Sequence, residues 1–144
     1  MSVTYYSAVR TKDRCKVQRR CDNETRELDA RNDLWNHSPT GFEWGYGGSG
    51  PAQLALAILA DATGDEDLAI ELHQTFKWEV VAKLPKEKWE LLRGAVIAWA
   101  YTHSQESEDA FLARASGQDG KDDSDTAKLI LDVAKGISRP ELDW

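Results

Sequence analysis

Residues 41–51 read Gly41-Phe42-Glu43-Trp44-Gly45-Tyr46-Gly47-Gly48-Ser49-Gly50-Pro51, so five glycines are interspersed with three large aromatic residues. Glycine has no Cβ and tolerates positive φ, which lets backbone or a ligand approach closely. The segment continues into residues 52–62, where Gln53 and Asp61 are the only polar side chains. A helix that is apolar on nearly all sides is a buried one, and a proline suits its first position. We therefore expect a glycine-rich loop followed by the central helix of the domain, with Gly64 as its stop.

The residues after this helix predict further helices. Asp65 is placed to cap a second helix, and Leu84-Pro85 ends it. A third helix is expected to start near Lys86, because apolar residues then recur at three- and four-residue spacing up to His103. Two shorter helices are expected at 106–115 and 125–135. The buried positions of the second and third helices are Leu68, Leu72, Phe76, Val80, Trp89, Leu92, Val96 and Trp99.

The residues before the loop predict strands. Residues 3–9 and 14–20 carry β-branched and aromatic residues at strand-like spacing, and a turn at 11–13 would join them into a hairpin. Residues 25–30 could add a third strand. The predicted fold class is α+β: an N-terminal β-hairpin or three-stranded sheet packed on a bundle of about five helices. We expect one domain over 1–144, divided into strands (1–35), the loop (36–50), a helical core (51–103) and an acidic helical extension (104–144).

Composition narrows the class of protein. The chain has 144 residues and is 41% hydrophobic, which allows one domain with a substantial core. No apolar run reaches transmembrane length, and the first residues lack the basic and apolar regions of a signal peptide. These features predict a cytoplasmic protein. Cys15 and Cys21 lack zinc-site partners, so we expect reduced thiols, although spacing alone does not decide against a disulfide.

Charge is distributed unevenly along the chain. The net charge is −7, which makes direct binding to nucleic acid unlikely. Basic residues gather within 10–31 and acidic residues after 104, so either patch could bind a protein partner of opposite charge, or both could be solvated faces. The candidate partner-binding residues in the two patches are Arg14, Arg19 and Arg20, and Asp122, Asp123 and Asp125.

Familiar catalytic motifs do not fit. Residues 45–50 satisfy G-x-G-x-x-G, but a dinucleotide fold needs a second strand where a helix is expected. No Lys-Ser/Thr follows the last glycine, as a phosphate loop requires. The three histidines, His37, His73 and His103, lack metal-site spacing, and His73 and His103 are expected to be packing residues. We therefore predict no catalytic residue, no metal and no cofactor.

The loop itself remains a candidate ligand or partner site, because amides at a helix N-terminus can bind an anion and its aromatic rings can stack. The alternative is a structural loop whose aromatic residues fill the core. A buried Glu43 would have a raised pKa and could serve acid–base chemistry, but an ion pair with Lys77 is the expected outcome. The candidate site residues in the loop are Glu43, Trp44, Tyr46, Gly47, Gly48 and Ser49.

Four segments together resemble an uncharacterised domain-of-unknown-function family found in bacteria, archaea and their phages. They are residues 36–40, the glycine-rich run, residues 52–57 and residues 76–85. The resemblance covers roughly residues 3 to 100 and is most specific in the central half. It implies a compact prokaryotic or phage domain and no particular activity.

Two functions are compatible with the sequence. The first is a non-enzymatic protein-interaction module, an inhibitor from a phage or other mobile element that occupies a host defence protein. A small acidic chain without a catalytic signature suits this function. The second is a small-ligand protein that binds or sequesters a nucleotide-like anion with the glycine-aromatic loop. The sequence does not identify the partner, the ligand or the oligomeric state.

Overall fold

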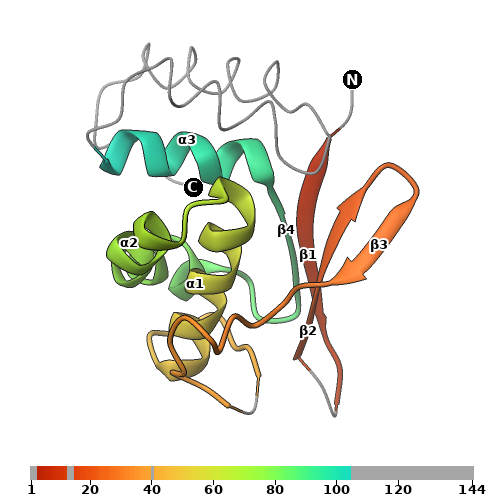
Figure 1. Ribbon diagram of the computed structural model, residues 1–144. Helices are drawn as coiled ribbons and strands as arrows, with labels where there is room; N and C mark the ends of the chain where they lie inside the picture. Colours follow the sequence, from red (N-terminus) through yellow and green to blue (C-terminus); the bar gives the residue numbers. More distant parts are fainter. Residues whose placement is uncertain (1–2, 13–14, 40, 105–144) are drawn as a thin grey trace.

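Four antiparallel strands form a sheet in the order β3-β2-β1-β4. The computed structural model describes residues 3–12, 15–39 and 41–104. The strands are β1 (Thr4–Arg10), β2 (Cys15–Cys21), β3 (Glu24–Glu27) and β4 (Lys88–Leu92). Figure 1 shows α1 (Ser49–Thr63), α2 (Glu66–Glu79) and α3 (Arg93–His103) on one side of this sheet. A short 3-10 helix, η1 (Val81–Lys83), follows α2. The molecule is therefore α+β.

The first two strands confirm the predicted hairpin to within a residue. Successive side chains point to opposite faces of a strand, and the inward set on β1 and β2 includes Tyr6, Ala8 and Val17, all buried. A tight turn joins β2 to β3, with Asp22 at a φ of 55°, a conformation that Asp tolerates better than most residues. The predicted third strand is β3, shorter and earlier than expected and exposed along its length.

The central helix is α1, as predicted. Nearly all of its residues are buried, because it lies between the sheet, α2 and α3. Gly64 ends it with a φ of 68°, which glycine adopts without steric cost. Pro51 is the third residue of the helix, not the first. Its missing N–H still falls in the first turn, where no intrahelical partner exists.

The predicted third helix is wrong at its start. Residues 88–92 form β4, which pairs with β1, and only from Arg93 does the chain become helical. Inward Trp89 and exposed Lys88 and Glu90 follow a two-residue period, whereas the three-residue step from Trp89 to Leu92 mimicked a helical seam. The part of the chain that the structure describes therefore forms a sheet of four strands, not a hairpin or a three-stranded sheet.

The predicted bundle of about five helices is also wrong: the described residues form three α-helices. The further helices predicted at 106–115 and 125–135, like most of the acidic extension at 104–144, lie outside the described residues. The N-cap predicted for the second helix is confirmed, because the Asp65 carboxylate accepts a hydrogen bond from the Leu68 N–H at 3.0 Å.

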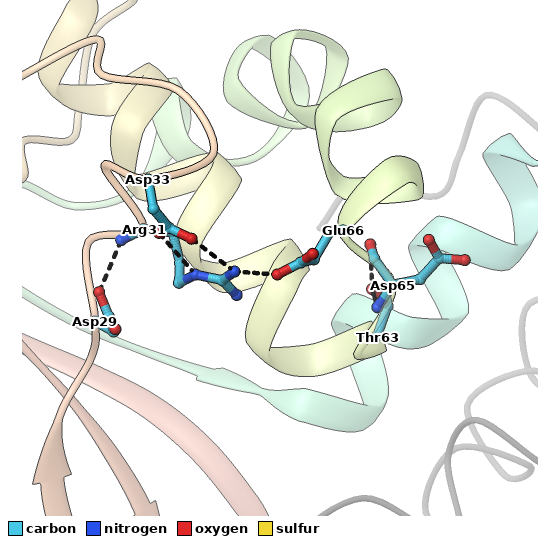
Figure 2. A network of polar contacts seen from close by, with 6 residues as sticks. All are labelled: Asp29, Arg31, Asp33, Thr63, Asp65 and Glu66. Carbon is cyan, nitrogen blue, oxygen red and sulfur yellow. Dashed lines mark hydrogen bonds and ion pairs between the residues drawn. The ribbon is translucent and has the colours of Figure 1, made fainter.

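An arginine network fixes the segment that leads from the sheet to the loop (Figure 2). Arg31 donates to the Asp33 carboxylate at 3.1 and 3.2 Å and also to Glu66 in the first turn of α2. Asp33, followed by Glu66, raises the pKa of the Arg31 guanidinium. The backbone N–H of Arg31 donates a hydrogen bond to the Asp29 carboxylate. This bond supports the positive φ of 53° at Arg31. The segment is thereby anchored to the N-terminus of α2.

Candidate functional site

An open cavity of about 770 Å³ lies between the hairpin end of the sheet and the N-terminus of α1. Such concave sites, with a few converging polar groups, are the usual places for ligands. The hairpin supplies cationic side chains to its wall, and the glycine-rich loop supplies the opposite wall. The lining residues that bear on its chemistry are Arg10, Lys12, Cys15, Lys16, Glu27, Glu43, Tyr46, Ser49 and Gly50.

A bidentate ion pair forms one wall of the cavity. Arg10 donates to both oxygens of Glu43, Nη2 to Oε1 at 2.7 Å and Nη1 to Oε2 at 3.1 Å. Arg10 also donates from Nε to the Lys86 carbonyl at 3.0 Å and lies 4.9 Å from the centroid of the Trp44 ring. This fork geometry is the arrangement in which arginine binds a carboxylate most strongly. The predicted ion pair between Glu43 and Lys77 is therefore wrong: Arg10 is the partner.

The Cys15 thiol completes this cluster. It donates to Glu43 Oε2 at 3.2 Å and accepts from Arg10 Nη1 at 3.1 Å. Burial, then the neighbouring Glu43, raises the pKa of Cys15, whereas hydrogen bonds from Arg10 lower the pKa of Glu43. The carboxylate is thus charged and the thiol protonated at neutral pH. Neither group has the pKa near 7 that a general base or a thiolate nucleophile needs.

The loop glycines allow close packing of aromatic rings. A Cβ on Gly47 would lie 2.2 Å from the Trp78 ring, and one on Gly48 would lie 2.7 Å from the Tyr46 ring. Both rings therefore lie close against backbone that has no side chain at these positions. Tyr46 and Trp78 nevertheless stay about half exposed, at 50% and 57%. The loop thus holds exposed aromatic rings in place instead of burying all of them.

The structure divides the predicted loop site. Glu43, Tyr46 and Ser49 line the cavity, while Gly47 and Gly48 lie beneath the exposed rings. Trp44 belongs to the core: it is fully buried, donates from Nε1 to the Lys86 carbonyl at 2.9 Å and packs edge-on against Trp89. The loop therefore combines the two predicted roles: Trp44 fills the core, and Tyr46 borders the cavity.

The family of the chain follows from its sequence over most of this fold. A model of DUF6166, described as a family of unknown function, matches residues 6–102. The chain belongs to DUF6166. The match spans β1 to α3 and includes the glycine-rich loop, so the resemblance seen in the sequence is confirmed. No curated protein and no solved structure matches the chain significantly.

The predicted charge patches are only partly visible in this DUF6166 chain. Arg19 faces the helices and is buried, with Nε 2.7 Å from Asp61 Oδ2. Arg20 is exposed on the opposite face of the sheet. Arg14 and the acidic residues Asp122, Asp123 and Asp125 lie outside the described residues. A partner contact through this patch would thus have to use Arg20 without Arg19.

Sequence reasoning missed several residues at the site. Arg10, Lys12 and Lys16 reach the cavity because the end of the hairpin folds beside the loop, a contact that no local pattern encodes. Trp78 could have been found, because it falls outside the buried Leu68–Leu72–Phe76–Val80 stripe of α2. Trp35 is also half exposed, at 49%, and stacks on His37 with ring centroids 4.9 Å apart.

The histidines behave differently from one another. His73 is buried and packs as predicted, and His103 stacks on Trp99. His37, predicted in a turn, meets His73, with the two Nε2 atoms 2.9 Å apart.

Among the described residues no group of three or more His, Cys, Asp or Glu side chains is placed to hold a metal ion. In the same part of the chain, no helix is long and apolar enough to cross a membrane.

Proposed function

We propose that this DUF6166 chain is a non-enzymatic protein-interaction module that binds its partner through three exposed rings, Trp35, Tyr46 and Trp78, which we propose act together as one aromatic face. The observation that carries the proposal is the exposure of these three large rings, at 49%, 50% and 57%. Tryptophan and tyrosine are the residues most enriched among those that dominate binding energy at protein interfaces.

Each ring of the aromatic face packs against other residues of the chain. Trp78 rests on Gly47 and carries the Lys77 ammonium 4.4 Å from its ring centroid. Trp35 packs on His37 and His73, and Tyr46 rests on Gly48. Because immobilising a side chain on binding costs free energy, rings that are already held lose less of their contact energy. Pre-ordered aromatic rings suit a tight stoichiometric contact.

The chemistry of the cavity supports a non-enzymatic function. Its one thiol is held in the protonated form and its central carboxylate is held by Arg10. We propose more specifically that the partner is a host defence protein and that the chain is a phage or mobile-element inhibitor that occupies the partner's surface. The support for this finer proposal is a small acidic chain, with a net charge of −7, and an aromatic face suited to blocking a surface.

The test compares variants of the aromatic face with a matched control. Immobilised wild-type chain, the Tyr46→Ala/Trp78→Ala double variant and a Val9→Ala/Leu92→Ala control would be exposed to host lysate. Val9 and Leu92 are similarly exposed but lie on the opposite face of the sheet. The proposal expects one protein retained by wild type and control and lost with the double variant, and a stoichiometric complex when that protein is purified. If the double variant retained the same protein, the proposal that the partner binds through the aromatic face would be refuted.

A small anionic ligand in the cavity is the second candidate. Arg10, Lys12 and Lys16 line it together with Ser49 and Gly50 at the start of α1, where backbone amides and the helix dipole favour an anion. The side chain of Tyr46 could stack on a ring. A melting-temperature screen with nucleotides and phosphorylated metabolites would test this function. A ligand whose stabilisation disappears in Lys12→Ala/Lys16→Ala, but not in Trp78→Ala, would favour it over protein binding.

A further inference from the structure

Two histidines join the segment before the glycine-rich loop to α2. His37 Nε2 lies 2.9 Å from His73 Nε2, and His73 Nδ1 lies 2.7 Å from the Ile70 carbonyl oxygen. A carbonyl only accepts hydrogen bonds, so His73 must carry its proton on Nδ1. Its Nε2 is therefore the acceptor, and His37 Nε2–H is the donor. The contact needs a free lone pair on one of the two Nε2 atoms.

The surroundings of this contact oppose extra positive charge. The titratable groups that face His37 are His73 and Lys77, both on α2, and burial followed by these two groups lowers the pKa of His37. On the α1 side the neighbour is neutral Gln53, and on its own segment it is the Trp35 ring. The Gln74 amide lies 3.4 Å from His73 Nε2 as a second, longer contact.

The singly and the doubly protonated pair differ in whether the contact can form. A first proton on His37 Nδ1 leaves Nε2–H in place, so the hydrogen bond to His73 survives and becomes charge-assisted. A second proton must occupy His73 Nε2 itself. Two N–H groups would then face each other at hydrogen-bond distance, on two like charges beside the Lys77 ammonium. Two N–H donors cannot hydrogen-bond to each other, so the contact is lost when both imidazoles are protonated.

We propose that the His37–His73 contact is a proton-operated latch: it holds His37 and Trp35 against α2 near neutral pH and releases them when both imidazoles are protonated. Release would move one of the three rings of the aromatic face. The use of the latch in binding rests on the proposed function, but its opening is a property of the isolated chain. A negative result for protein binding would therefore leave the latch testable.

Hydrogen bonds from Gln53 hold the backbone of the segment in place when the contact between the two histidines is lost. Gln53 Oε1 accepts from the backbone N–H groups of His37 and Ser38 at 2.7 and 3.1 Å, and its amide donates to the Ala30 carbonyl at 2.6 Å. These bonds do not titrate. Opening should therefore displace the side chains of His37 and Trp35 while the backbone stays bound to α1.

The experiment is an NMR titration of the full chain from about pH 8 to about pH 4.5, following the histidine Hε1 protons and the Trp35 indole N–H. We expect the Trp35 signal to move when both His37 and His73 have become protonated. In His37→Gln the amide can turn either its NH2 or its oxygen toward His73, so the Trp35 signal should stay constant. His103→Gln, which alters the remaining histidine, should keep the wild-type step.

Two outcomes would overturn the latch. One is a Trp35 signal that does not move in wild type while His37 and His73 both titrate. The other is an equal movement in wild type and His37→Gln, which would assign the change to another group. If His37→Gln is poorly folded at neutral pH, His73→Gln provides the same comparison from the α2 side, and the same two results decide it.

Discussion

Two cross-strand pairs on the inner face of the sheet hold one carboxylate each, and they differ mainly in burial. Tyr6 on β1 lies opposite Arg19 on β2, and both bind Asp61 Oδ2 at 2.7 Å. Arg10 lies opposite Cys15 on the same two strands, and both bind Glu43. The side chains of Arg19 and Asp61 are 7% and 17% exposed, whereas those of Arg10 and Glu43 are 31% and 33% exposed.

The difference separates a structural cluster from an accessible one. Asp61 comes from the last turn of the buried helix α1 and joins helix to sheet. Burial, followed by Asp61, raises the pKa of Tyr6 well above its ordinary value. Glu43 comes from the loop and lines the cavity. A buried ion pair is costly to break because the remaining charge is left without water. An ion pair that water reaches contributes little to the free energy of unfolding.

The largest effect is expected at the buried cluster. Asp61→Ala removes the acceptor of both Tyr6 and Arg19, so it should lower the free energy of unfolding by about 3–5 kcal/mol. Asp61→Asn keeps one oxygen acceptor and should cost less. Urea titration monitored by circular dichroism measures both. A loss below about 1 kcal/mol for the alanine variant would show that this cluster is no more important than the one at the cavity.

A smaller and pH-dependent effect is expected at Glu43. Because Arg10 lowers its pKa in the folded state, the folded chain binds fewer protons there than the unfolded chain. The stabilisation is therefore complete above the ordinary value of 4.5 and is lost as pH falls through the lower folded pKa. Glu43→Gln should cost below about 1 kcal/mol at neutral pH, since water screens the pair.

Denaturant titrations of wild type and Glu43→Gln at several pH values would test this assignment. The difference between the two proteins should narrow as pH falls from about 5 to about 3. A constant difference over that range would mean that the cost arises from packing and not from the charge of Glu43.

The same comparison shows what the sequence could predict. Tyr6, Arg19 and Asp61 lie in segments whose strand or helix was read correctly, because period-two alternation and an all-apolar helix are local signals. Their meeting was not predicted, since strand register and helix placement are set by tertiary packing. For Glu43 the sequence predicts an ion pair with Lys77, whereas its partner is Arg10. Arg10 lies at the end of the hairpin, which is distant in sequence from the loop. β4 was missed because its five residues fit a helical spacing by coincidence.

The candidate site was predictable to a similar degree. The glycine-aromatic composition marked residues 43–49 as unusual, and Tyr46 and Glu43 do line the cavity. Composition could not separate Trp44, which is buried, from Tyr46, which is exposed. The chain bends at Gly45, which has a φ of 84° and lies between the aromatic residue that enters the core and the one that leaves it. Only the packing of the loop on α1 and α2 decides which.

The smallest expected effect concerns the thiol of Cys15, which is partly exposed at one end of β2, whereas Cys21 at the other end is buried. Burial, then Glu43, raises the pKa of Cys15, so Glu43→Gln removes one of the groups that disfavour the thiolate and leaves Arg10, which favours it. We expect Cys15 to be alkylated by iodoacetamide several-fold faster at pH 8 in this variant, because only the thiolate reacts. Cys21 is 2% exposed and should stay slow in both proteins. Cys15→Ser identifies the fast phase by mass spectrometry. An unchanged rate would show that the Glu43 contact at 3.2 Å has no influence on the proton of the thiol.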